Sequence, residues 1–442
     1  MTKNTHEIRD PIHVFVRLDT DERKVLGSRA FQRLRYIHQL ALSYLVYPGA
    51  THRRFEHSLG VMELAGRVFD VVTNPENLTD NIRGLLPEAT SDDKRRYWRR
   101  VLRMAALCHD IGHLPFSHAA EKELLPQGWD HEKLTRDHIL GEEMASIWKK
   151  LEPPLNPEHV VKLAIGPKKA KDLQFTLWET TLSEIIVGDA FGVDRMDYLL
   201  RDSHHAGVAY GRFDHFRLID TLRILPTSYA GESQEPALGV QHGGLESAEA
   251  LLLARYFMYS QVYFHPIRRI YDIHLKDFLK EWLPDGMFST DLQRHLSVTD
   301  NEITAAILDA AFNDTLPGHD SARKIVLREH SRVIYSRNPH DAEINPEAGR
   351  LIIDSLSSKF GRQYFRTDRY AEKGVTHEFP LETKDGRIVS SIAMSDVLKR
   401  MPLLTIDTVY VAPEVRDEAQ DWLDNNRANI IQSTREVADG TT

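Results

Sequence analysis

Cysteine is almost absent from this chain, because Cys108 is the only one among 442 residues. A single thiol excludes an intrachain disulfide and any metal site built from several thiolates. Long apolar runs are absent too, since no stretch of about 18 apolar residues occurs. The polar start at residues 1–7 does not resemble a signal peptide. We therefore expect a cytoplasmic protein without a membrane segment.

Positive charge is also in short supply. Lys and Arg total 56 against 65 Asp and Glu, which leaves a formal net charge of -9. This balance argues against a general affinity for nucleic acid, so an anionic substrate would need a local concentration of arginines. The length suits two or three domains, or one large helical core with an appended lobe.

Three histidines and a carboxylate fall within residues 109–118, directly after an apolar stripe at residues 101–107. The stripe predicts a helix that ends near His109 and Asp110, because Gly112 and Pro115 stop helices. Imidazole and carboxylate together suit Mn, Fe, Zn or a carboxylate-assisted Mg, with no thiolate needed. The stretch therefore indicates a metal site at a helix end.

Two further His-Asp pairs serve as controls: His319-Asp320 and His340-Asp341. Each follows a proline in a polar segment with no apolar stripe leading in, so we interpret both as loop residues. The context of the pair carries the signal, and the dipeptide alone does not.

Two other polar clusters fall on apolar helices. His57 lies in the first turns of a helix whose apolar stripe runs from Val61 to Val72. Asp194, Arg195 and Asp197 interrupt a second apolar helix, where unpaired charges would be costly. The spacing does not show whether these groups meet the 109–118 stretch in space.

The remaining patterns predict a mainly α fold with a helical core and two small β elements. Residues 14–18 alternate as an edge strand or hairpin does, and residues 222–242 look like an inserted hairpin. A long helix at 245–283 should kink or split at Pro266. We expect a core over residues 1–285 and a C-terminal α+β lobe over 286–442, regulatory or used for oligomerisation.

Residues 94–103 carry six Lys and Arg residues interleaved with Tyr97 and Trp98. Such a patch could hold polyphosphate or nucleic acid. A solvated outer helix face is the simpler interpretation, and we favour it.

Three motifs in this order resemble the HD-domain metal-dependent phosphohydrolases, and within them the dNTP triphosphohydrolase branch. They are Arg54-Phe55-Glu56-His57-Ser58-Leu59-Gly60-Val61, His109-Asp110-Ile111-Gly112-His113 with Pro115-Phe116-Ser117-His118, and Asp194-Arg195-Met196-Asp197-Tyr198 with Arg201-Asp202 and His204-His205. The resemblance covers residues 9–275. It implies a helical HD-domain core.

The resemblance also implies roles for individual residues. The metal, Fe, Mn or Zn, would be held by His57, His109, Asp110 and Asp194, while Mg or Mn would accompany the substrate phosphates. The catalytic residues would be His131, Glu121, His118 and His113. The substrate would be bound by Gln39, Leu40, Arg54, Arg195, Tyr198, Asp202, Arg255, Tyr263 and His265. Without the resemblance, salt bridges and core packing would explain most of these substrate positions.

In the mammalian branch of the family an Asp, a Gln and an Arg read an activating guanine nucleotide. Gln32 and Arg35 match the last two, but Gly27 stands in place of the Asp, and Pro266 replaces a phosphate-binding lysine. The family further implies a homo-oligomer, dimer or tetramer. Activation by a nucleotide is left open.

The function we expect is hydrolysis of dNTP at the α-phosphate, giving deoxynucleoside and tripolyphosphate. One alternative is another phosphoester, such as a nucleoside monophosphate or a cyclic nucleotide. A third hypothesis is a nucleotide-sensing or nucleic-acid-binding protein in which hydrolysis is secondary, with residues 94–103 as its contact surface.

Overall fold

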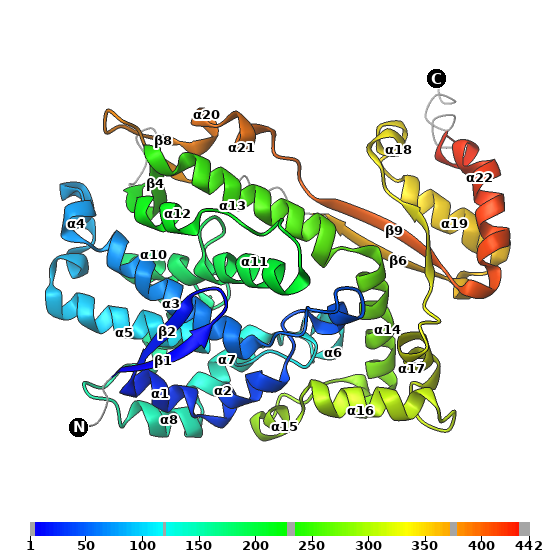
Figure 1. The fold of residues 1–442 in the computed structure, drawn as a ribbon, viewed down its shortest axis with the longest axis horizontal. Coiled ribbons are helices and arrows are strands. Elements are labelled where there is room, and N and C mark those ends of the chain that lie inside the picture. Colours follow the sequence, from blue (N-terminus) through cyan, green and yellow to red (C-terminus); the bar gives the residue numbers. More distant parts are fainter. Residues whose placement is uncertain (1–4, 118–120, 228–234, 372–377, 433–442) are drawn as a thin grey trace. The chain divides into compact units, whose positions relative to one another are not determined.

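The computed structural model describes residues 5–117, 121–227, 235–371 and 378–432 (Figure 1). The chain forms two compact units. The first contains Met1–Met258, Phe288–Ile303 and Val375–Met401, and the second contains Tyr259–Met287, Thr304–Gly374 and Pro402–Thr442. Each of these units is assembled from three separate stretches of the chain. The domain boundary that the sequence predicts near residue 285 stays a prediction.

Five helices form the core of the first unit. They are α3 (Arg54–Val72), α5 (Asp92–Cys108), α9 (Pro157–Ile165), α10 (Leu177–Val187) and α11 (Val193–Ala206). α3 packs on both α5 and α11, and α9 packs on α5 and α10. These packings follow from the apolar stripes, because each stripe buries one helix face against its neighbours. The mainly α fold is confirmed.

α5 illustrates how the sequence sets the ends of a helix that bears the site. The Ser91 side chain caps its first turn, and every residue from Val101 to Cys108 is buried. His109 is the C-terminal cap, as the apolar stripe and Gly112 predict. α3 likewise begins at Arg54, so His57 lies in its first turn.

Further helices of the first unit accompany this core. They are α1 (Thr20–Leu26), α2 (Arg29–Arg33), α4 (Asp80–Leu85), α6 (Glu121–Leu124), α7 (His131–Leu140), α8 (Glu142–Trp148), α12 (His215–Thr221), α13 (Leu245–Met258), α15 (Leu292–Ser297), α20 (Ser391–Met394) and α21 (Asp396–Arg400). Within the described part of the chain, no helix has the length and apolar character that crossing a membrane requires.

Two small sheets complete the first unit. β1 (Thr5–Asp10) and β2 (Val14–Asp19) pair as an antiparallel hairpin. The predicted hairpin at 222–242 is present as β3 (Leu222–Pro226) and β4 (Pro236–Gln241), although its turn lies outside the described residues. The sequence pattern did not reveal that β7 (Pro380–Glu382) and β8 (Ile388–Ser390) extend this hairpin into a four-stranded sheet.

The second unit is the predicted α+β type. Its sheet has the order β5 (Arg332–Ser336), β9 (Thr405–Val411), β6 (Phe365–Ala371), with both pairs antiparallel. Its helices are α14 (Pro266–Trp282), α17 (His319–Val326), α18 (Pro339–Ile344), α19 (Ala348–Phe360) and α22 (Arg416–Gln432). The residues of α16 (Asp300–Ala311) are divided between the two units after Ile303. The core packs Ile352, Leu356 and Phe365 together with Val409 and Leu423.

Two predictions about prolines have different outcomes. The expected break at Pro266 is confirmed, because α14 begins there after a π-helical turn at Tyr259–Tyr263. The loop assignment of the two control pairs is wrong, since His319-Asp320 opens α17 and His340-Asp341 lies in α18. Pro339 occupies the first position of α18, where proline is favoured. We had interpreted this proline as a sign of a loop, but it starts a helix.

Candidate metal and catalytic site

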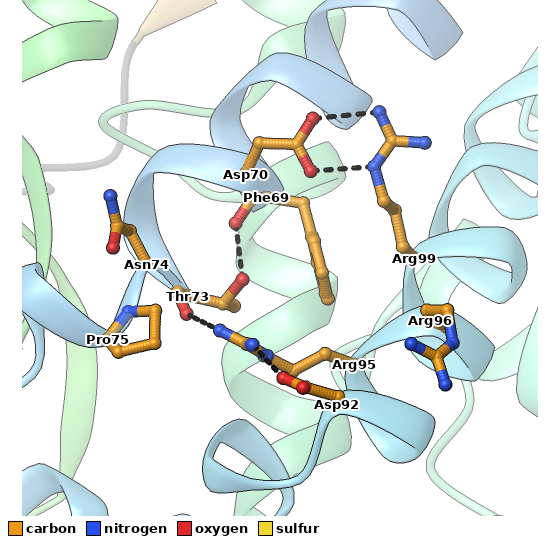
Figure 2. A pocket seen from close by; sticks show the side chains of 9 residues that line it. All are labelled: Phe69, Asp70, Thr73, Asn74, Pro75, Asp92, Arg95, Arg96 and Arg99. Carbon is orange, nitrogen blue, oxygen red and sulfur yellow. Dashed lines mark hydrogen bonds and ion pairs between the residues drawn. The ribbon is translucent and has the colours of Figure 1, made fainter.

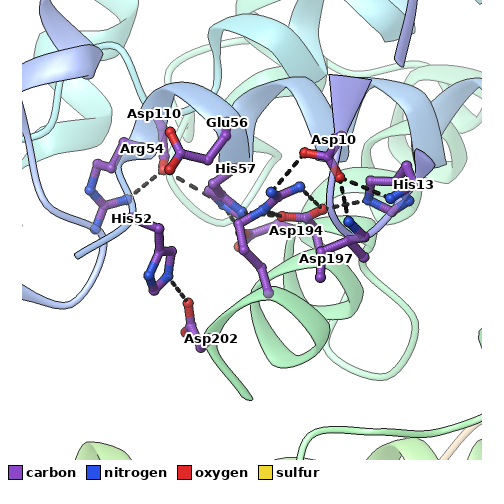
Figure 3. A network of polar contacts seen from close by, with 12 residues as sticks. Asp10, His13, His52, Arg54, Glu56, His57, Asp110, Asp194, Asp197 and Asp202 are labelled. Atoms are coloured by element: carbon purple, nitrogen blue, oxygen red, sulfur yellow. Dashed lines mark hydrogen bonds and ion pairs between the residues drawn. The ribbon is translucent and has the colours of Figure 1, made fainter. Parts of the chain in front are cut away.

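His57, His109 and Asp110 meet in the core of the first unit. One ligand atom from each lies within 4.8 Å of the others, and all three side chains are buried. α3 supplies His57, and the end of α5 supplies the other two. The predicted ligands from separate helices therefore converge, and Figure 3 shows His57 and Asp110 beside Asp194.

His109 is oriented so that a neutral ring can offer Nε2 as a metal ligand. Its Nδ1 donates to the carbonyl of Ala106 at 2.7 Å, which leaves the lone pair on Nε2. That Nε2 is buried and has no hydrogen-bond partner among the described residues. It lies 3.3 Å from Asp110 Oδ1 and 3.6 Å from Asp194 Oδ1. An orphaned imidazole nitrogen facing two carboxylates fits a divalent cation.

Asp194 approaches the same point from the first turn of α11. Its Oδ1 lies 3.0 Å from His57 Nε2. Burial raises the pKa of Asp194, but the nearby imidazoles of His109 and His57 lower it below its ordinary value. Burial lowers the pKa of His57, whereas its bonds to Asp194 and Asp197 raise it to about 10. A cation bound here would replace the His57 proton, so binding should release a proton.

Asp197 supports His57 from behind. It accepts a 2.8 Å hydrogen bond from His57 Nδ1, which directs Nε2 toward the ligand cluster. Asp197 is itself held by His13 at 2.7 Å and by Arg201, which also bonds Asp10 (Figure 3). The sequence marks Asp197 as costly to bury, but no role was predicted for it. Its place three residues after Asp194, on the same helix face, was the signal.

Gly60 explains how Asp197 comes so close to α3. A Cβ atom at Gly60 would lie 1.9 Å from Asp197 Oδ1, which no side chain could tolerate. The glycine three residues after His57 therefore opens the space for the supporting carboxylate.

Arg54 joins the ligand cluster to the turn that follows it. Its Nη1 donates to Asp110 Oδ2 at 2.5 Å, and its Nε donates to Ser117 Oγ at 2.7 Å. The side chain is buried, so this guanidinium brings a full positive charge directly to the cluster. The predicted phosphate ligand thus lies where an anion would meet the ligand cluster.

His131 forms a second cluster with two carboxylates. Both its backbone N–H and its Nδ1 donate to Glu121 Oε1, at 2.6 Å and 2.7 Å. Glu132 lies 3.3 Å from Nδ1 and also pairs with Lys169. Glu121 thus orients the imidazole, as an acid–base pair requires.

His113 connects the two clusters. Its ring stacks on His131 with centroids 4.0 Å apart, and its Nε2 lies 3.2 Å from Asp110 Oδ1. Burial, Arg54 and His131 lower the pKa of His113 well below its ordinary value. Burial lowers the pKa of His131, but Glu121, together with Glu132 and Asp110, raises it above its ordinary value. The stacked pair therefore combines an imidazole that gives up its proton easily with one that holds its proton more strongly than a free imidazole does. The predicted acid His118 lies outside the described residues.

Gln39 and Leu40 reach the site through a short β-like pairing. The Gln39 N–H donates to the carbonyl of His52, and the Arg54 N–H donates to that of Ile37. Leu40 is buried, and the Gln39 Oε1 is buried without a hydrogen-bond partner in the described residues. Asp202, the predicted sugar ligand, is buried and accepts a 2.7 Å bond from His52 Nε2. His52 had been given no role.

The other predicted substrate ligands are less directly placed. Arg195 donates to the carbonyls of Gly188 and Asp189 in the turn before α11. Arg255 on α13 acts electrostatically on the same Asp189. Tyr198 is half-buried on α11. Tyr263 and His265 are half-buried and belong to the second unit.

The candidate regulatory residues bond to each other. Gln32 Nε2 donates to the carbonyl of Leu26, and Arg35 Nε donates to Gln32 Oε1 at 2.9 Å. The Arg35 guanidinium also lies 3.5 Å from the centre of the Phe55 ring. Both side chains are therefore ordered next to the start of α3.

The basic face of α5 is largely neutralised. A cavity of about 330 Å³ lies between its first turns and the end of α3. There Arg99 bonds Asp70 through two contacts of 2.6 and 2.8 Å (Figure 2). Each of the other arginines also has a carboxylate partner: Arg95 with Asp92, Arg96 with Asp93, Arg100 with Asp21, and Arg103 with Glu22. Paired guanidiniums favour the solvated helix face over a nucleic-acid surface.

Comparison with known proteins adds family information. A model described as HD domain matches residues 54–198, and one described as HD associated region matches residues 213–338. A crystal structure of a hypothetical protein from Aquifex aeolicus is similar, with TM-score 0.76 and 30% identity, covering 95% of this chain and 100% of that one.

Curated relatives match part of the chain. The uncharacterized protein YwfO of Bacillus subtilis is 34% identical over 302 residues, 67% of this chain and 61% of YwfO. The deoxynucleoside triphosphate triphosphohydrolase SAMHD1 of Homo sapiens is 30% identical over 302 residues, 62% of this chain and 44% of that enzyme. The matches thus span about half to two thirds of those relatives' own length.

Proposed function

The chain belongs to the HD-domain family with an HD-associated region, in the dNTPase-like group, and from this premise we propose that it is a metal-dependent dNTP triphosphohydrolase. It would hydrolyse dNTP at the α-phosphate to deoxynucleoside and tripolyphosphate. One observation carries the proposal: in the buried His57–His109–Asp110 cluster, next to the buried cation Arg54, an imidazole nitrogen has no hydrogen-bond partner among the described residues.

His57, His109, Asp110 and Asp194 would hold the metal, for which Fe, Mn and Zn are the candidates by donor type. A divalent ion there would act as a Lewis acid toward a phosphate oxygen. Asp197 keeps Nε2 of His57 directed at the cluster, and the carbonyl of Ala106 does the same for His109.

The phosphate chain would bind along the arginines. Arg54 is already next to the cluster, and it would exchange part of its bond to Asp110 for a phosphate oxygen. His131, protonated through Glu121, would stabilise charge on the α-phosphate. Arg195, Tyr198 and Arg255 would bind the distal phosphates. His118 would protonate the leaving 5′ oxygen.

The sugar would lie against Gln39, Leu40 and Asp202. Asp202 would accept from the 3′-OH, and its bond to His52 fixes the carboxylate in one orientation. Tight packing of Leu40 against the sugar would exclude a 2′-OH. His265 would complete the substrate contacts.

Regulation and assembly form a separate part of the proposal. Gln32 and Arg35 would contribute to a site for an activating nucleotide, and the chain would assemble as a dimer or tetramer. The C-terminal lobe would serve that regulation or assembly.

The test is to incubate metal-replete protein with each dNTP and NTP, singly and in pairs, and to identify the phosphate product. Tripolyphosphate from dNTPs supports the proposal. Orthophosphate from nucleoside monophosphates would favour the alternative phosphoester substrate. No turnover in any mixture would contradict both.

A further inference from the structure

The turn after the metal ligands has an uncommon backbone. Phe116 and Ser117 both have φ near +54°, a left-handed conformation that residues with a Cβ rarely adopt. Two such residues in a row persist only where surrounding contacts hold them, and such positions cluster at functional sites. Ser117 is also the residue that accepts from Arg54 Nε.

A distant carboxylate holds this turn. Asp300, at the start of α16, is fully buried, and its Oδ1 accepts from the Phe116 N–H at 2.8 Å. Its Oδ2 accepts from both the backbone N–H and the Nδ1 of His38, each at 2.7 Å. The Phe116 ring stacks on the His38 ring, with 6.2 Å between centroids and 9° between planes. One side chain thus joins the turn to the segment that carries Gln39.

Arg33 provides a second anchor, and its acceptor Val298 lies two residues before Asp300. Arg33 donates to the carbonyl of Val298 through Nε and Nη2, and to the carbonyl of His113 through Nη1 at 2.8 Å. The turn is therefore tied to residues 298–300 at both of its ends. All these residues belong to the first unit.

We propose that Asp300 is a positioning residue for catalysis, which holds the strained turn so that Ser117 keeps Arg54 in place beside Asp110. The inference rests on the proposed function for the role of Arg54, but its structural part does not. Of the contacts that the structure describes for Asp300, the bond to Phe116 leads through Ser117 to Arg54, and we assign the effect to this route.

The test uses Asp300→Asn, which keeps the size but places an N–H donor against the N–H of Phe116 or His38. With metal-saturated full-length protein we expect kcat to fall by about 10²-fold, as a small misplacement of a phosphate ligand can cause. KM and metal content should change little, whereas the melting temperature should fall because buried hydrogen bonds are lost, so kcat is compared at temperatures where the variant is folded. Amide hydrogen exchange at Phe116 and His38 should accelerate. The matched control is Asp291→Asn, because Asp291 caps α15 in the same segment without touching the turn.

A double-mutant cycle separates this role from general stability. Ser117→Ala removes the bond to Arg54 and should fold, since it deletes a single oxygen. If Asp300 acts through Ser117, the loss of kcat in the double variant will be smaller than the product of the single losses. Multiplicative losses, or unchanged exchange at Phe116 in Asp300→Asn, would overturn the proposal.

Failure of the proposed function would look different. If dNTPs are not hydrolysed, the exchange experiment still reports whether Asp300 holds the turn, and kcat is measured on whichever phosphoester the protein cleaves. Accelerated exchange without loss of kcat on that substrate would overturn the catalytic part.

Discussion

Two clusters of histidine and carboxylate lie in the first unit, and they differ in what their nitrogens face. In the His57–His109–Asp110 cluster the Nδ1 atoms are used for support, and Nε2 of His109 has no hydrogen-bond partner in the part of the chain that the structure describes. In the Glu121–His131–Glu132 cluster the Nδ1 of His131 is bonded to a carboxylate that also accepts its backbone N–H. The first arrangement suits a cation, and the second suits a proton.

Composition alone would not distinguish them, because both offer three ligand atoms within 4.8 Å. The difference lies in the neighbours. Ala106 and Asp197 accept from the ligand histidines on the side away from the cluster, whereas Lys169 already neutralises Glu132. The hydrogen bonds around a cluster of histidines and carboxylates therefore indicate whether it binds a metal ion or a proton. We expect the two clusters to respond differently to substitution.

The largest expected effect comes from Asp110→Asn. Loss of this charge removes a ligand and also the partner of Arg54, so we expect metal content and turnover both to fall to background. Elemental analysis and a phosphate-release assay check the two. Full metal content in a folded Asp110→Asn variant would break the distinction between the clusters.

His131→Asn should give the contrasting result. The variant loses the acid–base group, so turnover should fall by about 10²- to 10⁴-fold. Metal content should match that of the unaltered protein, because His131 holds no cation. Loss of metal from this variant would assign both clusters to metal binding.

Asp197→Asn probes the support of a ligand rather than the ligand. We expect metal affinity to weaken by about 10- to 100-fold, as loss of such hydrogen bonds typically does. Titration with a competing chelator measures this. Because Arg201 loses part of its partner, thermal unfolding must be recorded alongside, and affinity is compared only at temperatures where the variant is folded. Unaltered metal affinity would show that Asp197 stabilises the helical core but does not support His57 as a metal ligand.

The smallest effect is a shift in the pH profile. The lowered pKa of His113 and the raised pKa of His131 predict full turnover across a window that includes pH 6.5, falling in acid as His113 charges and in alkali as His131 deprotonates. Glu121→Gln removes the group that raises the pKa of His131, so the alkaline limb of kcat should move to lower pH. If the alkaline limb does not move, the loss of turnover at high pH is not caused by deprotonation of His131.

Much of the site could be predicted because its signals are local. The apolar stripe before His109, the cap at Ser91 and the breaking residue Gly112 define the end of α5 within a few residues. The motif resemblance then joined His57 and Asp194 to that stretch. Their convergence within one cluster agrees with the resemblance.

The supporting residues could not be predicted in the same way. Asp197 lies 140 residues from His57, and Asp300 lies 262 residues from His38. Periodicity shows which helix face is buried but not which distant partner it meets. The loop assignment of His340-Asp341 failed for a local reason, since a proline starts a helix as readily as it ends one.

The most direct test of the central claim is hydrolysis of a dNTP in ¹⁸O-labelled water by metal-replete protein. Attack on the α-phosphorus with departure of the 5′ oxygen predicts one labelled oxygen in tripolyphosphate and none in the deoxynucleoside, as read by mass spectrometry. Asp110→Asn under the same conditions should yield no labelled product. Label in a nucleoside monophosphate or in orthophosphate, without tripolyphosphate, would contradict the account.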